Sequence, residues 1–383
     1  MFFSFALSLY HKVALHSRWF HRAEGRRRSS TKDITIMKVL YRTFLSLFCL
    51  LSFSMTAWSQ VAENSPQYPS LTVSEQQLRL KLSAWMSLLP DSTSFIRLFI
   101  PATHDAATDA FLSLSASRQK GLQCQSGDFE SQFAAGARGY DVRVGDDLRL
   151  YHSSAATVHT FDELLVTINK LLDSHPTETV VMLLKRENGA KGKYTQWLQA
   201  VANSLNKRLG KRLFNGLTPE TTLGQLRGKV LLISRENFDA DPATKGLMKA
   251  GGFATWTDNP KRSIEIFTNY DSAQTPLTFF LQDCYKEIDC HGKAQLAQQG
   301  MKESSRLLRN RTGSILYTSL AGRPADNARI INPEVLAFLR SATAPSCHGL
   351  LFMDFLNSRD EKAGVQLAFT IVAQNFKLTH GRM

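Results

Sequence analysis

Short apolar runs, several of them rich in β-branched residues, recur along the chain and alternate with amphipathic segments. The runs cover residues 95–100, 148–151, 179–184, 230–233, 314–320 and 350–355. Apolar residues at consecutive positions are typical of strands that are buried on both faces, as in parallel sheets. Because parallel strands need helical connections, the alternation predicts an α/β fold with a parallel sheet, either open or closed into a barrel.

The segments between these runs carry helix signals. Thr160 and Glu163 form a capping box before a helix over 161–174, whose apolar positions share one face. The same spacing over 197–209 predicts a second helix. An Asn-Pro-Glu sequence at 332–334 predicts the start of a third, with Asn as the cap and Pro in the first turn.

The size of the chain fits one domain after a leader. The 383 residues are 43% apolar, and no internal repeat or second shift of composition follows residue 73. A single α/β barrel needs ~250 residues. We therefore predict a polar linker over 60–73 and one barrel domain over 74–383.

The first 59 residues resemble an export leader rather than part of the fold. Met37 is followed by two cations and an apolar run over 44–53, and Ala57 and Ser59 are small enough for signal-peptidase cleavage before Gln60. The apolar run is short for a bilayer span. We predict translation from Met37, an upstream extension over 1–36, and a mature protein without a transmembrane segment that is secreted, either outside the cell or into the periplasm.

The positive charge gives no evidence for a nucleic-acid partner. The formal net charge is +13, of which +7 belongs to residues 1–59. The remaining surplus is modest, and no dense basic stripe accompanies it. We expect at most a weak attraction to an anionic membrane surface.

Four cysteines remain after residue 60. Export permits disulfides, and the short spacing favours a Cys284–Cys290 bond, which leaves Cys124 to pair with Cys347. A metal site at Cys290 and the adjacent histidine would lack a paired C-x-x-C partner. Among the three pairings that four cysteines allow, we therefore predict these two disulfides, and we expect no metal site at Cys290.

Charged residues stand where most of the predicted strands end. This set comprises His104, Asp105, Asp141, Arg143, His152, Lys185, Arg186, Glu187, Arg235, Glu236 and Asp354. Charge at a strand end is common because water begins there, but this set combines two histidines with arginines and carboxylates. Barrel enzymes gather their catalytic groups at the carboxyl ends of the strands. We expect an active site there.

Two histidines beside an arginine suit phosphoryl transfer between oxygen atoms. One imidazole can take the proton of an attacking hydroxyl while the other protonates the leaving alkoxide. An arginine fork can hold two phosphate oxygens, and carboxylates behind the imidazoles fix their tautomers.

At these residues the chain resembles the bacterial phosphatidylinositol-specific phospholipases C. The resemblance rests on ordered motifs at 100–105 (IPATHD), 136–143 (GARGYDVR), 151–152 (YH), 176–187 (PTETVVMLLKRE), 227–232 (RGKVLL) with Arg235, 331–334 (INPE) and 353–355 (MDF). It implies a distorted (β/α) barrel that cleaves phosphatidylinositol, or its glycosylated form, at a membrane surface. The products would be diacylglycerol and inositol 1,2-cyclic phosphate.

The resemblance also implies a role for each matching residue. His104 corresponds to the general base with Asp354 behind it, His152 to the general acid with Asp105 as its partner, and Arg143 to the phosphate clamp. The matching substrate-site residues are Lys185, Glu187, Arg235, Asp283 and Tyr285.

Metal-dependent relatives carry acidic residues where this chain has Arg143, so the resemblance implies catalysis without a metal ion. Two other classes stay open: a metal-dependent glycerophosphodiester phosphodiesterase, and an inositol-lipid-binding module without catalysis. We expect a monomer in every case.

Overall fold

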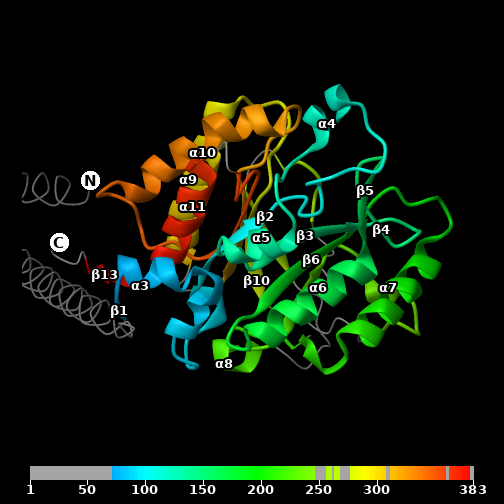
Figure 1. The fold of residues 1–383 in the computed structure, drawn as a ribbon, viewed down its shortest axis with the longest axis horizontal. Coiled ribbons are helices and arrows are strands. Elements are labelled where there is room, and N and C mark those ends of the chain that lie inside the picture. Colours follow the sequence, from blue (N-terminus) through cyan, green and yellow to red (C-terminus); the bar gives the residue numbers. More distant parts are fainter. Residues whose placement is uncertain are drawn as a thin grey trace, which may run out of the picture. The chain divides into compact units, whose positions relative to one another are not determined.

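The predicted alternation of strands and helices is present in the computed structural model (Figure 1). The model describes residues 71–379 except 215, 246–255, 261–262, 268–276, 308–310 and 359–361. The predicted start at Met37, the cleavage before Gln60 and most of the linker lie outside the described residues. Among the described residues, no helix combines the length and apolar character that crossing a membrane requires.

The strands are β1 (Thr72–Ser74), β2 (Phe99–Thr103), β3 (Gly139–Val144), β4 (Arg149–His152), β5 (Ala155–Thr160), β6 (Val180–Arg186), β7 (Leu213–Phe214), β8 (Val230–Ser234), β9 (Ile264–Phe267), β10 (Thr278–Gln282), β11 (Gly313–Tyr317), β12 (Gly349–Met353) and β13 (Lys377–Thr379). The α-helices are α3 (Glu75–Leu80), α4 (Ala116–Leu122), α5 (Phe129–Ala134), α6 (Phe161–Ser174), α7 (Tyr194–Arg208), α8 (Leu223–Leu226), α9 (Cys290–Leu307), α10 (Pro324–Arg340) and α11 (Lys362–Ala373). Four short 3-10 helices are η1 (Leu82–Leu88), η2 (Phe95–Arg97), η3 (Gly210–Arg212) and η4 (Phe238–Ala240).

Eleven of the described strands form one curled sheet. Its order is β7-β8-β6-β3-β2-β12-β11-β10-β9, and β4 and β5 extend from β3 as an antiparallel hairpin meander. Neighbours along the main path are parallel except β9 and β10. Within the described ranges no pairing joins β7 to β9, so the barrel is incomplete. The predicted distorted barrel is confirmed.

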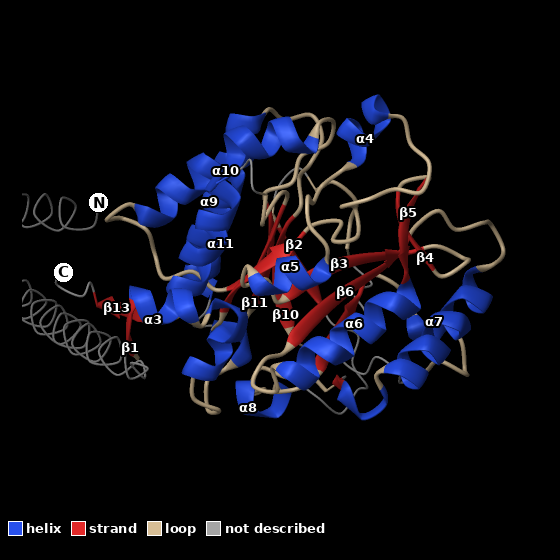
Figure 2. Cartoon of the chain, in the orientation of Figure 1, coloured by secondary structure: helices blue, strands red, loops and turns tan. Residues whose placement is uncertain are grey.

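The sheet separates three apolar clusters. Alternate residues of β2, β6, β8, β10, β11 and β12 point into the curl, among them Ile100, Val181, Leu231 and Leu350, and form the interior cluster. The outer residues of β3, β6 and β8 pack on α6 and α7, while the outer residues of β2, β11 and β12 pack on α9, α10 and α11. Figures 1 and 2 show these two helix layers on opposite sides of the strands, which are red in Figure 2. The period of two along each strand therefore decides which side chains face the interior.

Two predicted boundaries are wrong. The chain at 95–97 forms η2 instead of a strand, because the backbone N–H of Phe95 donates to Thr221 and Ser94 pairs with Thr222, which holds this segment away from the sheet. Helix α10 begins at Pro324, with Pro333 inside it rather than in its first turn. Its Asn332 is no cap, because its buried side chain donates to the carbonyl oxygen of Asp354 at 3.0 Å.

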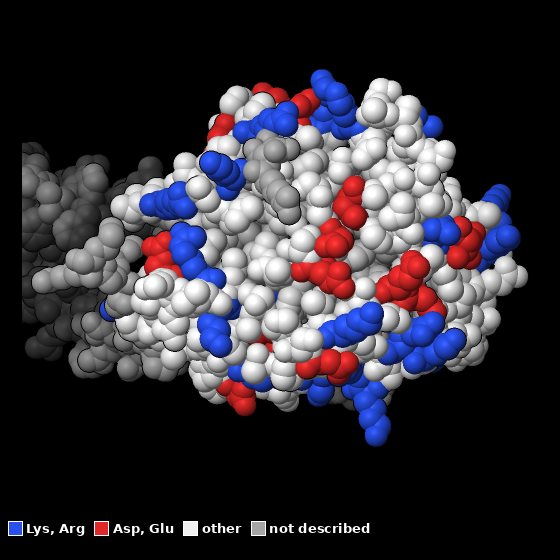
Figure 3. Space-filling model, viewed as in Figure 1, with Lys and Arg blue, Asp and Glu red and all other residues white. Residues whose placement is uncertain are grey.

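Other local predictions are confirmed. The capping box of Thr160 and Glu163 opens α6, and α7 covers most of the predicted second helix. The described surface carries both signs of charge, and no continuous basic stripe crosses the face of it shown in Figure 3.

Candidate active site

The residues predicted to carry chemistry meet in one pocket at the carboxyl ends of the strands. The pocket has a volume of about 480 Å³. Eight predicted residues line it: His104, Arg143, His152, Lys185, Glu187, Arg235, Asp283 and Tyr285. The other two, Asp105 and Asp354, are buried directly behind the histidines.

The strand period explains why these residues converge. His104 lies two positions after Ala102, which faces the interior cluster, and Asp354 lies two positions after the interior residue Phe352. The same step of two from the last interior apolar residue leads to Lys185, Arg235 and Asp283 at the ends of three other strands. Each strand therefore continues its inner face into the pocket.

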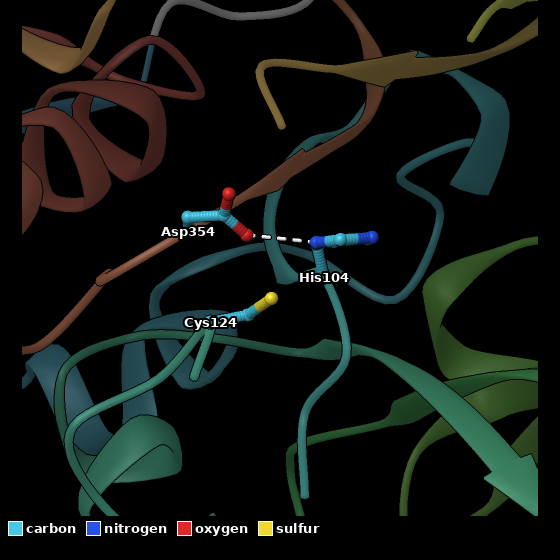
Figure 4. A group of neighbouring side chains, drawn as sticks. All are labelled: His104, Cys124 and Asp354. Atoms are coloured by element: carbon cyan, nitrogen blue, oxygen red, sulfur yellow. Dashed lines mark hydrogen bonds and ion pairs between the residues drawn. The ribbon is translucent and has the colours of Figure 1, made fainter. Parts of the chain in front are cut away.

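His104 lies at the centre of a hydrogen-bond network. Its Nδ1 is 2.7 Å from Asp354 Oδ1 (Figure 4), and its Nε2 is 2.9 Å from Arg143 Nη2. Because the guanidinium can only donate, Nε2 must accept, which places the imidazole proton on Nδ1 facing Asp354. Burial lowers the pKa of His104, but the carboxylates of Asp105 and Asp354 outweigh burial and the opposing Arg143 charge, so the pKa is raised.

Asp105 is shared among three partners. Its carboxylate lies 2.7 Å from Arg143 Nε, 3.3 Å from His104 Nε2 and 3.5 Å from His152 Nε2. The resemblance paired Asp105 with His152, whereas in the structure its shortest contact is to Arg143. The Nδ1 of His152 instead donates to the carbonyl oxygen of Leu122 at 2.7 Å.

Arg143 is held in place by two carboxylates. Besides Asp105, it contacts Asp141 through Nη2 at 2.9 Å. Burial by itself would raise the pKa of Asp141, but the charges of Arg143 and His104 outweigh burial and lower the pKa to about 2. Asp141 was predicted among the charged residues at the strand ends, on the same face as Arg143, but no role in the site was assigned to it.

A second group of charged residues lines the pocket beside the first, since Lys185 on β6 is the cross-strand neighbour of Arg143 on β3. Lys185 Nζ lies 2.7 Å from Glu187 Oε2, and Glu187 Oε1 accepts from the backbone N–H of Ser153 at 3.0 Å. The Arg235 guanidinium lies over the Trp256 ring at 4.6 Å, and Trp256 Nε1 donates to Asp283 Oδ2 at 3.0 Å. Burial raises the pKa of Asp283 against the opposing charge of Arg235.

The sequence interpretation missed several residues of this site. Tyr317 lines the pocket, with its ring 6.0 Å from that of His104. It follows the interior residue Ile315 by two positions, so the step that leads to His104 also leads to Tyr317. Trp256 packs partly buried against the interior cluster and also donates to Asp283.

Backbone strain accompanies the site. Asp105, Ser153 and Phe355 adopt positive φ angles of 44°, 55° and 53°. Asp105 is itself a site residue, whereas Ser153 follows His152 and Phe355 follows Asp354. Strained backbone of this kind clusters at functional sites. A positive φ such as that of Ser153 is one that glycine adopts without a steric cost.

The predicted disulfides are wrong. The four described cysteines are free thiols. Cys124 lines the pocket near His152, whereas Cys347 packs in the cluster against α9, α10 and α11. Cys290 points to Asn327 Oδ1 on α10, and Cys284 is buried beneath the loop that follows β10. The spacing of the cysteines along the chain does not show which way each thiol points in the folded protein.

Several donor sets in the described residues could hold a cation. They are His104 with Cys124 and Asp354, Asp105 with Cys124 and His152, and His104 with Asp105 and Asp141. In each set the ligand atoms lie within 4.8 Å of one another. The first two share Cys124, whose thiol was not part of any predicted site.

Comparison with known proteins identifies the family. Residues 99–236 match the model of the phosphatidylinositol-specific phospholipase C X domain. The chain is also 30% identical over 332 residues to the 1-phosphatidylinositol phosphodiesterase of Listeria monocytogenes, which covers 82% of this chain and 93% of that protein. The chain belongs to the phosphatidylinositol-specific phospholipase C family. The resemblance predicted from the motifs is thereby confirmed.

Other members of the phosphatidylinositol-specific phospholipase C family agree with this assignment. The 1-phosphatidylinositol phosphodiesterase of Staphylococcus aureus is 24% identical over 332 residues, covering 83% of this chain and 93% of that protein. The phosphatidylinositol-specific phospholipase C of S. aureus superposes with a TM-score of 0.64 at 20% identity, covering 79% of this chain and 99% of the other. The Listeria enzyme superposes with a TM-score of 0.56 at 24% identity, covering 76% and 98%. These structures share the fold of this chain.

Proposed function

We propose that this protein cleaves the phosphodiester of phosphatidylinositol without a metal ion, through acid-base catalysis by His104 and His152. The observation that carries the proposal is the placement of the two imidazoles, with ring centroids 6.4 Å apart, in the pocket that also contains the Arg143 guanidinium. The family membership supports the substrate class.

His104 acts as the general base. Its Nε2 carries no proton, because the imidazole proton is on Nδ1 facing Asp354. On substrate binding, Nε2 exchanges its hydrogen bond from Arg143 Nη2 for one from the inositol 2-hydroxyl, and it takes that proton as the oxygen attacks phosphorus. The Asp354 carboxylate then stabilises the imidazolium. The ring oxygen and phosphorus form the cyclic ester of inositol 1,2-cyclic phosphate.

His152 acts as the general acid. Its Nδ1–H is held by the carbonyl of Leu122, so the second proton of the imidazolium is on Nε2, 3.5 Å from Asp105. This proton passes to the glycerol oxygen as the bond to phosphorus breaks, releasing diacylglycerol. Each histidine contributes ~10²- to 10⁴-fold to the rate.

Arg143 stabilises the phosphate. Within the described part of the chain, its contacts with Asp105, Asp141 and His104 use Nε and Nη2 and leave Nη1 toward the pocket. A guanidinium held by two carboxylates cannot move away, so it is already in place where charge develops on the phosphoryl oxygens.

The second group of pocket residues binds the inositol ring. Lys185, Arg235 and the carboxylates of Glu187 and Asp283 offer donors and acceptors for sugar hydroxyls, and Tyr285 offers a ring face. Both free phosphatidylinositol and its glycosylated form present this ring. Export by the 37–59 leader would bring the monomeric enzyme to such lipids outside the cytoplasm.

The test is incubation with phosphatidylinositol vesicles in excess chelator, with phosphorus NMR to detect inositol 1,2-cyclic phosphate. We expect turnover in the wild type and a loss of at least ~10²-fold in His104→Ala and in His152→Ala. His159→Ala is the matched control, because His159 pairs with Asp109 outside the pocket lining. Activity that survives in either pocket variant would contradict the mechanism.

The same experiment separates the alternatives. A metal-dependent glycerophosphodiester phosphodiesterase would lose activity in chelator, and a lipid-binding module would bind the vesicles without product. Repeating the assay with a glycosyl-phosphatidylinositol-anchored protein compares the two lipid substrates.

A further inference from the structure

A thiol lies inside the pocket where the proposed acid-base chemistry has no use for one. Cys124 is fully buried from solvent yet lines the pocket. Its Sγ is 3.9 Å from His152 Nδ1, 4.0 Å from Asp105 Oδ2 and 3.6 Å from the carbonyl oxygen of Leu122. These are long, weak contacts, so the thiol is held without a strong hydrogen bond.

The backbone fixes the position of this thiol between the loops that carry the two catalytic carboxylates. The N–H of Cys124 donates to Thr108 Oγ1 at 2.9 Å, in the loop after Asp105. Its carbonyl oxygen accepts from the N–H of Phe355 at 2.7 Å, in the residue after Asp354. The thiol therefore has a defined place relative to the His104–Asp354 pair.

Cys124, His104 and Asp354 form a donor set suited to a thiophilic cation. One ligand atom from each lies within 4.8 Å of the others, and Figure 4 shows the sulfur pointing toward the His104–Asp354 hydrogen bond. Zinc accepts this combination of sulfur, nitrogen and oxygen, with tetrahedral ligands roughly 3.4 Å apart, so side-chain shifts of about 1 Å complete the set.

The local charges also favour a cation at this place. Arg143 contacts the Nε2 edge of His104, whereas Asp354 accepts from Nδ1 on the opposite edge, and the Cys124 sulfur points toward that Nδ1–Asp354 hydrogen bond (Figure 4). Asp105 and Asp141 neutralise the guanidinium from its other side. A metal ion at Nδ1 is thus separated from the arginine by the width of the imidazole.

We propose that Cys124, His104 Nδ1 and Asp354 bind Zn²⁺ or a similar thiophilic divalent cation, and that this binding switches the enzyme off. The thiol releases its proton to solvent on binding. When the metal takes the place of the proton on Nδ1, that proton moves to Nε2, which then donates to Asp105 Oδ2, 3.3 Å away, and no longer accepts from Arg143 Nη2. The lone pair that would deprotonate the substrate is thereby removed. The inhibitory part of this inference rests on the proposed function of His104; the metal site itself does not.

The site is tested by titrating Co²⁺ into the full chain and recording its visible and charge-transfer absorption. We expect one tetrahedral cobalt per chain with a thiolate band, lost in Cys124→Ser and in Asp354→Asn and displaced by Zn²⁺. Cys347→Ser and Cys290→Ser are the matched thiol controls and should keep the band. His152→Gln should also keep the thiolate band, because His152 belongs only to the alternative donor set of Asp105, Cys124 and His152, which we do not propose.

The inhibition is tested by adding Zn²⁺ to the phosphatidylinositol assay. The rate of each variant is normalised to its own zinc-free rate. The zinc concentration for half-inhibition should then be at least about 100-fold higher for Cys124→Ser than for the wild type, as expected for loss of a direct ligand. Equal inhibition of the wild type and Cys124→Ser, or a cobalt band unchanged by Cys124→Ser, overturns the proposal. A Cys124-dependent band in a chain without phospholipase activity would leave the site standing and refute the function instead.

Discussion

Two arginines five residues apart on one segment serve opposite ends of the same strand. Arg138 precedes β3, and Arg143 lies near its carboxyl end. Arg138 is fully buried, and all five of its N–H groups have acceptors, two of them bonds to Glu178 Oε2. The other acceptors are the carbonyl oxygens of Ser83, Phe133 and Ala137. Arg143 shares two carboxylates and a histidine but keeps Nη1 toward the pocket.

The difference shows how one kind of ion pair can serve either stability or binding. At the amino end the guanidinium is completely satisfied, so it can accept no ligand and its loss would leave a buried carboxylate. At the carboxyl end the carboxylates fix the guanidinium without occupying it. Strand β12 repeats the contrast, with His348 just before it and Asp354 just after it.

The largest effect should follow from replacing Arg143. We expect Arg143→Ala to lower kcat about 10³-fold, because a preorganised donor to the phosphate is lost. Arg143→Lys should recover only part of this rate, since an ammonium cannot reproduce the fork. Steady-state kinetics measure both, and full activity in the lysine variant would contradict the role of the fork.

Breaking the pair at the other end should change stability instead of chemistry. We expect Glu178→Gln to lower the free energy of unfolding by about 3–5 kcal/mol, because the Arg138 charge stays buried without a partner. Denaturant unfolding measures this loss. The kcat of the folded fraction should stay unchanged, and a drop comparable to that of Arg143→Ala would remove the distinction between the two ends.

His348, at the amino end of β12, should make the stability of the protein depend on pH. Burial lowers its pKa from 6.5 to about 4, and Nε2 is 3.1 Å from the carbonyl oxygen of Thr312. The unfolded chain takes up this proton first, so the stabilisation is present above pH 6.5 and is lost as the pH falls toward 4. We expect His348→Gln to flatten this part of the stability curve by about 3 kcal/mol. Parallel curves for the variant and the wild type would contradict this assignment.

The smallest effect concerns strain at the pocket. Ser153 has a φ of 55°, so Ser153→Gly should raise the free energy of unfolding by about 0.5–1 kcal/mol. Ser115→Gly is the matched control, because Ser115 has a φ of −65° and should gain nothing. Thermal unfolding compares the two variants, and equal shifts would show that Ser153 is not strained.

Much of the site could be predicted because it follows from local periodicity. The apolar runs give the strands, and a step of two from the last interior residue leads to His104, Lys185 and Asp354. The same rule reaches Tyr317, which was missed because only charged residues were considered at the strand ends. Boundaries at 95–97 and 324–333 failed where a long-range contact, through Thr221 or Asp354, decided the local structure.

The sequence by itself determined the alternating fold, the family and the residues that face the pocket, because each depends on neighbours a few positions apart. Only the tertiary structure decided that Asp105 is shared by Arg143 and both histidines, that the cysteines stay apart, and that Cys124 lies beside His104 and Asp354. These features depend on contacts between segments far apart in the chain, such as that between Cys124 and Phe355. The direction of a side chain across such a contact is set by packing, which no local pattern encodes.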